Sequence, residues 1–263
     1  MTCGADGEQS CPQRGVAFWT SALQATLEHN NPSLGSICPS GVTKSAPIQR
    51  RCQRDVSALT VEVVHTGPNA MTKATSKFPT LTTKRLRLRR FERRDLADLH
   101  ACFSDPVAMR YWNSPPCKTM ADTERALAWL AKTTSPYDHL AWAACKKSND
   151  RCIGMVNYHS RDARNRRLQL GYITLPKYQR NGFGTEAVRA VLNYCTDELN
   201  VHRVEAFMHP DNSPSLRLAE GLGFCCEGGP LLDYWRVGTK FVSVMIYALI
   251  NKTDEQSGGA PRH

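Results

Sequence analysis

The sequence predicts a mixed α/β domain over residues 81–250, in which a meander of antiparallel strands is followed by alternating helices and strands. The first observation behind this prediction is a series of apolar, strand-like segments separated by short polar turns, at residues 140–145, 152–158 and 167–174. The second is a change to helical periodicity after Pro176, at residues 182–199 and 212–221. Because short turns join antiparallel neighbours, we do not expect a doubly wound parallel sheet.

Each remaining element has a local signal of its own. Residues 85–89 alternate arginine and leucine with the period of two that is typical of a strand. Apolar side chains recur at helical spacing within residues 92–103 and 119–132. Further strands are predicted at residues 203–207, 224–228 and 241–249. We therefore expect a central, mixed and mostly antiparallel sheet of about seven strands flanked by about four helices.

The segments on either side of this domain have a different composition. Residues 1–80 are rich in Ser, Thr, Pro, Gly, Asn and Gln and show no sustained periodicity, so we expect a mostly disordered N-terminal extension. Met71 is a possible alternative start, which would make residues 1–70 an extension without function; the competing interpretation is a targeting segment. Residues 251–263 are expected to form a flexible C-terminal tail.

Composition excludes some classes of protein and leaves others open. The chain is 41% hydrophobic and 22% charged, and no apolar run approaches the length of a membrane span, so we expect a cytoplasmic protein. The 11 cysteines lack the C-x2-C spacing of a zinc site, and we expect no metal. The net charge of +10 suits either a nucleic acid or a ligand with several phosphates. Without a nucleic-acid-binding motif, we favour the phosphorylated ligand.

The most informative segment is residues 170–187, in which a strand leads through a loop with two glycines into a long helix. Glycine lets the backbone approach a bulky anion, and the free N–H groups at a helix start attract negative charge. The loop is therefore suited to a pyrophosphate. Gly182 to Ala187 also fits the dinucleotide pattern G-x-G-x-x-A, but Pro176 to Asn181 separate these glycines from the strand, which is not typical of a Rossmann unit. A helix start that needs glycine only for packing is the structural alternative.

Several motifs in series resemble the GNAT superfamily of acyl-CoA N-acyltransferases. Gln179-Arg-Asn-Gly-Phe-Gly184 is similar to its [RQ]-x-x-G-x-[GA] acyl-CoA loop. The segments at residues 202–206, 209–215 and 221–224 follow in the order and spacing of that family, and residues 86–89 and 105–112 resemble its first strand and its acceptor-side helices. The ribosomal-protein N-acetyltransferase-like branch is the most similar. The resemblance covers about residues 80–250.

The resemblance implies a GNAT fold that binds acetyl-CoA as co-substrate. Backbone N–H groups near residues 173–175 would polarise the thioester carbonyl, the loop would hold the pyrophosphate, and Asn212 would contact the pantetheine arm while capping a helix. The residues assigned to the cofactor in this way are Ile173, Thr174, Leu175, Gln179, Arg180, Asn181, Gly182, Phe183, Gly184, Thr185 and Asn212.

The resemblance also suggests catalytic and acceptor-binding residues. Ser215 would donate a proton to the leaving thiolate, and Glu205 is a candidate general base, with Asp233 and His209 as weaker candidates. Each has a structural alternative, an ordinary helix serine or a salt-bridged strand residue. Many relatives carry an acidic residue near the position of Ser243, and this departure leaves the base open. Tyr111 and Trp112 are candidates for the acceptor pocket, although an aromatic pair is more often part of a core.

The predicted function is transfer of an acetyl group from acetyl-CoA to a primary amine, by direct attack in a ternary complex. The acceptor would be a protein N-terminus or a small-molecule amine, and neither a membrane nor a nucleic acid is an expected partner. One alternative is an acyl-CoA-binding sensor or scaffold without turnover. A second is an NAD(P)-binding oxidoreductase, which depends only on the glycine pattern. Neither the length of the acyl chain nor the oligomeric state can be predicted from these residues.

Overall fold

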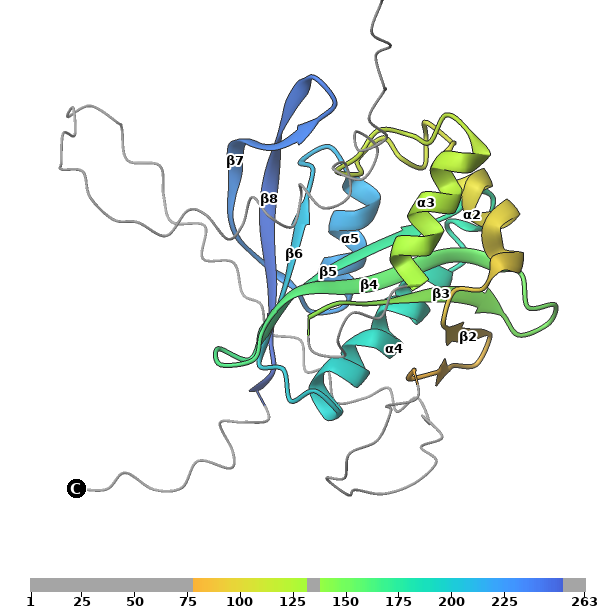
Figure 1. The fold of residues 1–263 in the computed structure, drawn as a ribbon. Helices are drawn as coiled ribbons and strands as arrows, with labels where there is room; N and C mark the ends of the chain where they lie inside the picture. The colour runs from red at the N-terminus through yellow and green to blue at the C-terminus, as the bar shows by residue number, and fades with distance from the viewer. Residues whose placement is uncertain (1–77, 132–137, 253–263) are drawn as a thin grey trace, which may run out of the picture. The chain divides into compact units, whose positions relative to one another are not determined.

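The computed structural model describes residues 78–131 and 138–252, and their strands form one eight-stranded sheet (Figure 1). Its spatial order is β1-β2-β3-β4-β5-β6-β8-β7, and all neighbours are antiparallel except β5 and β6. The strands are β1 (Leu81–Thr82), β2 (Leu86–Arg89), β3 (Leu140–Lys146), β4 (Cys152–Asp162), β5 (Arg167–Thr174), β6 (Arg203–Met208), β7 (Cys225–Val237) and β8 (Lys240–Ile250).

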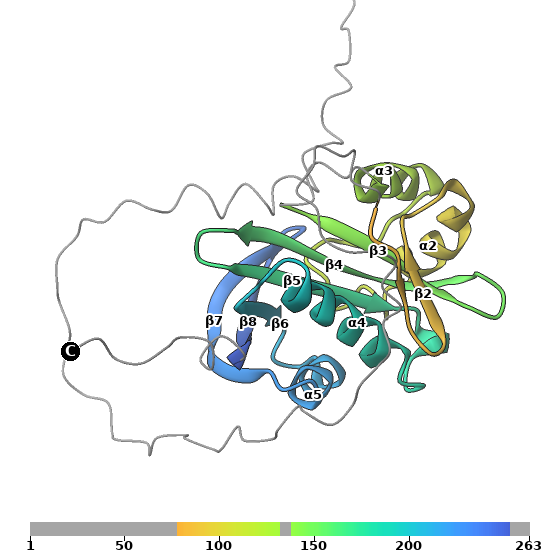
Figure 2. The same ribbon diagram turned by 90° about the horizontal axis from the view of Figure 1, so that it is seen from below.

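Four α-helices cover the two faces of this sheet. They are α2 (Leu96–Phe103), α3 (Met120–Ala131), α4 (Phe183–Asp197) and α5 (Ser213–Gly221). The first two contact β4 and β3 on one face, whereas α4 and α5 lie together on the opposite face, as Figure 2 shows. Short 3-10 helices, η2 (Arg93–Asp95) and η3 (Pro176–Tyr178), precede α2 and follow β5.

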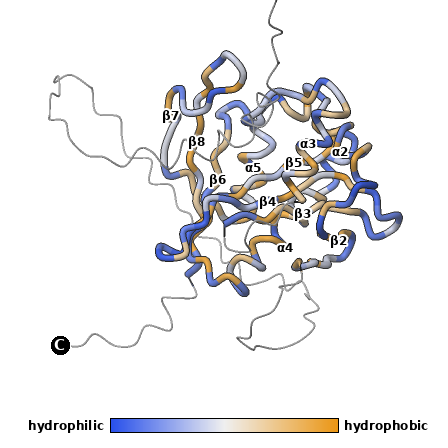
Figure 3. Tube along the Cα trace, in the orientation of Figure 1, coloured by the Kyte–Doolittle hydropathy of each residue, from blue (hydrophilic) through white to orange (hydrophobic). Residues whose placement is uncertain are grey.

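The burial pattern explains why these segments form strands. Residues 140–145 of β3 are buried throughout because helices lie on both faces of that strand, whereas β6 alternates between buried and partly exposed positions. Even-numbered residues of β5 and β6 pack with α4 and α5 in the main core, so their odd-numbered residues face the other way. In Figure 3 the apolar colour is clearest along β8, and the charged β4–β5 turn is mostly hydrophilic.

The fold predicted from the sequence is confirmed, including all four helices. The sheet has one strand more than the expected seven, because Leu81 and Thr82 add the short edge strand β1. β7 also continues past the predicted end at residue 228, as far as Val237. The sequence suggested a stop there because Gly228-Gly229-Pro230 is unfavourable in a regular strand. The pairing with β8 accommodates this segment through several register shifts.

The described domain begins slightly before the predicted boundary. The Trp142 indole donates to the Pro79 carbonyl at 2.7 Å, and the Phe78 ring packs edge-on against it with centroids 5.8 Å apart. Phe78 therefore packs against the core, and the Pro79 carbonyl is hydrogen-bonded to it. The expected N-terminal extension up to residue 77, the possible start at Met71 and the tail beyond residue 252 lie outside the described residues. Within the described ranges, no helix is long and apolar enough to cross a membrane.

Candidate active site

The central feature of the site is a gap in the sheet between β5 and β6, which we call the split. β5 pairs with β4 along nearly its whole length, but with β6 only from Arg167↔Arg203 to Gln169↔Glu205. Beyond Gln169 the strands separate, so among the described residues no strand pairs with the edge of β5 that faces β6. A backbone edge of this kind can accept an extended ligand through the hydrogen bonds that a strand would otherwise make.

The orientation of the β5 backbone decides which amides face the split. Leu175 N–H donates to the Ile153 carbonyl at 2.9 Å, so this group is already used on the β4 side. Because donors alternate along an antiparallel pair, the Ile173 N–H also points to β4, whereas those of Tyr172 and Thr174 point into the split. Of the three residues expected to polarise a thioester, Thr174 is the one whose amide is directed there.

The predicted acyl-CoA loop lies directly after η3, at the start of α4. Arg180 and Gly182 have positive φ values of 61° and 74°, which turn the chain sharply into the helix. In the described part of the chain, no backbone N–H of residues 180–185 has a hydrogen-bond partner. Unpaired amides at the positive end of a helix dipole form a binding site for an anion such as a pyrophosphate.

Side chains within the loop stabilise its shape. The Gln179 side-chain amide donates to the Thr174 carbonyl at 2.9 Å, and the Asn181 side-chain amide donates to the Gln179 carbonyl at 2.9 Å. The side chains of Gln179 and Asn181 therefore support the loop, while the Arg180 side chain is exposed and has no side-chain partner within the described residues. The loop presents its backbone, rather than these amides, to a ligand.

Arg85 connects the loop to the residues just before β2, and no local motif predicted this role. Its guanidinium donates to Glu186 at 2.6 Å and to the Asn181 carbonyl at 2.9 Å, and it lies 4.3 Å from the centre of the Phe183 ring. Thr83 also donates to Glu186, at 2.5 Å. Burial acts to raise the pKa of Glu186, but these hydrogen bonds outweigh it and leave the pKa below its usual value.

The two glycines of the loop serve different purposes. Gly182 has the left-handed conformation that favours glycine, and a Cβ there would lie 3.3 Å from the Arg85 guanidinium. A Cβ on Gly184 would instead point inward, 3.3 Å from Thr174 Oγ1 and 3.4 Å from a methyl carbon of Leu218 on α5. Gly184 therefore allows close packing of α4 against β5 and α5, which is the packing alternative considered above.

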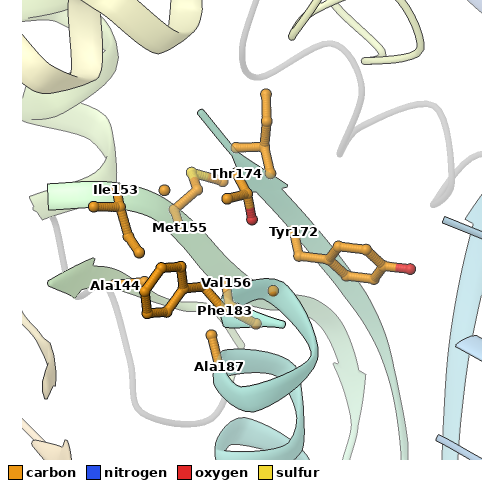
Figure 4. A pocket seen from close by; sticks show the side chains of 11 residues that line it. Ala144, Ile153, Met155, Val156, Tyr172, Thr174, Phe183 and Ala187 are labelled. Carbon is orange, nitrogen blue, oxygen red and sulfur yellow. The ribbon is translucent and has the colours of Figure 1, made fainter. Parts of the chain in front are cut away.

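A small pocket lies beneath the first turn of α4, next to Gly184 (Figure 4). It receives residues from three neighbouring strands as well as from the helix. In Figure 4 the side chain of Tyr172 points away from the other lining residues, toward the side where β6 and α5 lie. The lining residues are Ala144, Ile153, Gly154, Met155, Val156, Tyr172, Ile173, Thr174, Phe183, Gly184 and Ala187.

The split has two arms, β5 on one side and β6 with the following α5 on the other, and we call the second the far arm. The far arm carries the predicted Asn212 and Ser215. Asn212 is the N-cap of α5, and its side-chain oxygen accepts from the Ser215 N–H at 3.4 Å, which confirms the predicted capping role. Ser215 Oγ lies 2.7 Å from the Tyr172 hydroxyl, so α5 and β5 are connected across the split. The sequence predicted the serine but gave no signal for its tyrosine partner.

The opposite face of the split is lined by aromatic pairs. Tyr111 packs on His209, which follows β6, with ring centroids 5.1 Å apart. Phe207 stacks in parallel on Tyr234 of β7 at 5.3 Å. After the roles that the resemblance implies, we call the side covered by α2 and α3 the acceptor face, and the side with α4 and α5 the CoA face. The structure thus brings Tyr111 to the end of β6, whereas among the described residues Trp112 has only a backbone hydrogen bond, from its N–H to the Met109 carbonyl at 3.0 Å.

The candidate bases differ in their surroundings. Glu205 is at the last paired position before the split, faces the acceptor side, and forms an ion pair with Arg203 at 2.8 Å. His209 Nδ1 accepts the Asp211 N–H at 3.1 Å, and its ring packs against Tyr111, so Nδ1 already has a partner. Asp233 is exposed on β7, and its N–H donates to Ser243 Oγ at 3.3 Å. Among these, Glu205 has the position that suits a base.

One group of potential metal ligands occurs in the described residues, away from the split. Asp95, Cys145 and Cys152 are buried with their ligand atoms close together. However, Arg89 donates to both carboxylate oxygens of Asp95 at 2.8 Å, and a hydrogen bond with Cys145, together with burial, raises the pKa of Cys152. This arrangement satisfies the carboxylate without a cation, and we assign no metal to it.

Known proteins are similar to this chain in both sequence and fold. The family model described as "Acetyltransferase (GNAT) domain" matches residues 85–225, more than half of the chain. An uncharacterised N-acetyltransferase of Bacillus subtilis, YoaA, is 28% identical over 176 residues, which cover 66% of this chain and 97% of that protein.

Solved structures share the fold at lower identity. A ribosomal-protein-S5-alanine acetyltransferase from Vibrio fischeri has a TM-score of 0.58 at 19% identity, covering 66% of this chain and 98% of that chain. A spermidine N-acetyltransferase from Vibrio cholerae, in complex with CoA and spermine, has a TM-score of 0.54 at 22% identity, covering 63% and 95%. The glycine loop, the split sheet and the family match agree: the chain belongs to the GNAT acetyltransferase family and is an acetyl-CoA-dependent acyltransferase.

Proposed function

We propose that this chain transfers the acetyl group of acetyl-CoA directly to a primary amine bound on the acceptor face. The observation that carries the proposal is the split itself. Its edge offers unpaired β5 amides to a pantetheine arm, and it lies beside a loop whose six consecutive N–H groups, at residues 180–185, have no partner in the described chain.

The cofactor would bind along the CoA face. The amides of residues 180–185 would hold the pyrophosphate, with Gln179 and Asn181 keeping the loop in shape. The pantetheine arm would extend along residues 173–175 toward α5, where Asn212 and Ser215 begin the helix. The thioester would then lie where the Thr174 N–H points, so that this donor stabilises the oxyanion formed during attack.

The amine would approach from the acceptor face. Glu205 is proposed as the general base, acting directly or through water, because it stands where β5 and β6 separate. Nitrogen attack forms the N–C bond, the C–S bond breaks with its electron pair on sulfur, and Ser215 lies beside the departing thiolate. Tyr111 would line the acceptor site together with Phe207 and Tyr234.

The charges near the split favour one class of acceptor over another. A polyamine carries several positive charges and would need several unpaired carboxylates. The negative charge of Glu205 is balanced by an ion pair with Arg203, which also binds Glu227 at 2.9 Å. The rest of the described acceptor face is mainly aromatic. This arrangement favours an amine with an apolar or aromatic body, such as a protein N-terminus or a small aromatic amine, over spermidine.

An acceptor screen tests the proposal. The full chain is mixed with acetyl-CoA and, in turn, spermidine, short peptides with free N-termini and small aromatic amines, and the release of free thiol is followed. Thiol release with a peptide or an aromatic amine supports the proposal, and release only with spermidine contradicts the acceptor assignment. CoA binding without release for any amine would favour the sensor or scaffold without turnover.

Two further statements belong to the proposal. We propose that the catalytic unit is the segment 81–250 with the preceding residues 78–80, and that the N-terminal region is not needed for catalysis. We also keep the expectation of a reaction without a metal, in a cytoplasmic setting. Full activity of a chain that starts at Met71 would support the first statement, and activity retained after treatment with a metal chelator would support a reaction without a metal.

A further inference from the structure

Tyr172 and Ser215 form a hydrogen-bonded pair across the split. The Tyr172 hydroxyl oxygen lies 2.7 Å from Ser215 Oγ, 3.2 Å from the Ser215 carbonyl oxygen and 3.7 Å from Met208 Sδ. Tyr172 stands on the separated part of β5, whereas Ser215 is in the first turn of α5 and Met208 ends β6. One side chain therefore connects both arms of the split where they no longer share backbone hydrogen bonds.

The hydrogen-bond geometry allows two arrangements of the protons. In one, Ser215 Oγ–H donates to Tyr172, and the Tyr172 proton is directed at the Ser215 carbonyl. In the other, Tyr172 donates to Ser215 Oγ, so the Ser215 proton points elsewhere and is available to a ligand. An acceptor-only group placed beside Ser215, such as a thiolate, would select the second arrangement.

We propose that Tyr172 is a positioning residue that donates to Ser215 Oγ and thereby directs the Ser215 hydroxyl proton at the sulfur of CoA. This inference rests on the proposed function, which places the sulfur beside Ser215. Two hydroxyls in series form a short chain of donors that ends at the leaving group, and each bond in such a chain strengthens the next. The chain stabilises the thiolate as it departs with the electrons of the C–S bond.

The pair donates hydrogen bonds rather than protons. Burial raises the pKa of Tyr172 to about 12, against the opposite effect of its hydrogen bond with Ser215, so the phenol stays protonated at neutral pH. A thiol has a pKa of about 8.5, and its thiolate is too weak a base to remove a proton from either hydroxyl. The amine proton leaves through Glu205 or water, and the sulfur departs as the thiolate, so charge and protons balance without ionisation of the pair.

Titration of the CoA thiol in the complex tests this arrangement without an acceptor amine. The ultraviolet absorbance of the thiolate is followed against pH for CoA bound to the full chain and to its variants. We expect the bound thiol to have a lower pKa than free CoA, and Ser215→Ala to remove about one unit of that decrease. Tyr172→Phe should remove about half a unit, and the double variant should match Ser215→Ala, because Tyr172 acts only through Ser215.

Tyr247→Phe is the matched control. Tyr247 also donates from a strand to α5, with its hydroxyl 3.1 Å from Glu220, but that contact is toward the far end of the helix. Removal of this hydroxyl should leave the thiol pKa unchanged. Desulfo-CoA, which lacks the sulfur, should bind to wild type and to Tyr172→Phe with equal affinity.

The outcomes separate this inference from the proposed function. If CoA binds and Tyr172→Phe leaves the thiol pKa unchanged, or if the two variants have additive effects, the positioning role is wrong while the CoA site stands. If neither CoA nor desulfo-CoA binds to the wild type, the proposed function and the inference fall together. With an active acceptor, kcat should fall about threefold to tenfold in Tyr172→Phe, with little change in the KM for acetyl-CoA.

Discussion

The two faces of the split consist of different chemical groups. The CoA face consists of backbone N–H groups, two glycines and a hydroxyl pair, and the Arg85–Glu186 ion pair holds its loop in place. The acceptor face consists of stacked aromatic rings and a carboxylate that is already paired with an arginine. Both faces use the same two strands, since odd and even residues of β5 and β6 point to opposite sides.

The proposed function explains this difference by the nature of its two ligands. The pyrophosphate and the pantetheine arm of CoA would be the same in every reaction, and backbone amides can bind them without depending on particular side chains. The acceptor must be distinguished by its shape and charge, which requires side chains, and these come from separate segments of the chain. Changes on the CoA face should therefore alter binding of every acyl donor, whereas changes on the acceptor face should alter which amine reacts.

The largest expected effect is that of Gly184→Val on CoA binding. The valine methyl groups would need space already occupied by Thr174 and Leu218, so the start of α4 must move and its amides lose their alignment. Loss of two charge-assisted hydrogen bonds predicts a roughly 100-fold or greater weakening of CoA affinity by calorimetry. Gly184→Ala should be far milder, because a single Cβ requires shifts of only a few tenths of an ångström.

Gly221→Val is the matched control for this experiment. A Cβ at Gly221, near the end of α5, meets nothing within 4 Å. It should leave CoA affinity unchanged, and a similar loss in both valine variants would show that the effect is not specific to the loop. NAD or NADP binding in preference to CoA would contradict the assignment of this loop.

The next largest effect is a pH dependence of stability that originates on the acceptor-side face of the sheet. His139 packs at a tilted angle against Trp129 of α3, with ring centroids 4.5 Å apart, and burial lowers the pKa of its imidazole to about 4. In the unfolded chain histidine titrates near 6.5, so between these values the unfolded state binds the extra proton and the free energy of unfolding falls as the pH falls. At pH 5 the loss is about 2 kcal/mol.

Urea unfolding at pH 7 and pH 5 measures this loss, and His139→Phe should reduce it because the titrating group is gone. Burial also lowers the pKa of His159 to about 4, so part of the dependence should remain in the variant. Glu186 on the CoA face has a lowered pKa and loses its contribution only as the pH falls through and below about 4.5. An equal loss in wild type and variant would contradict the role of His139.

The sequence predicted the CoA face better than the acceptor face, for a physical reason. The loop from Gln179 to Thr185 is contiguous, so its glycines and helix start could be identified from local chemistry alone. Arg85 and Tyr172 were missed because their partners are about a hundred and about forty residues away, and an ordinary strand arginine or tyrosine has the same local appearance. Pairing across the sheet is not encoded in a local pattern.

The acceptor face shows the same limit more strongly. Tyr111 was predicted from the resemblance, but its contact with His209 depends on how α2 and its following segment fold over the sheet. Tyr234 lies on a part of β7 that the sequence did not predict as strand. The position of the split has no local signal in the sequence, because it results from register and twist rather than from a particular residue type.

A smaller effect should follow from Arg85→Ala. The ion pair with Glu186 is partly exposed, since 42% of the Arg85 side chain is accessible, so its contribution to stability should be small. The contact with the Asn181 carbonyl also orders the loop, and its loss should weaken CoA binding about fivefold. Arg87→Ala is the control, because Arg87 pairs with Asp150 at 2.6 Å, away from the loop. Equal effects of the two substitutions on CoA affinity would show that Arg85 has no specific role.

The smallest expected effect on stability is that of Asn212→Ala. The cap bond to the Ser215 N–H is long, at 3.4 Å, so its loss should cost about 0.5 kcal/mol, at the lower end of the range for N-caps. If the same side chain also contacts the pantetheine arm, CoA affinity should fall by more than this loss explains, about fivefold or more.

Asn212→Ser separates the two roles, since serine is an equally good cap but has a shorter side chain without an amide. Thermal unfolding should show that serine restores the stability lost in the alanine variant, while calorimetry should show that CoA affinity stays low. Recovery of both properties by serine would mean that Asn212 acts only as a helix cap, and that the far arm of the split contacts the cofactor through Ser215 alone.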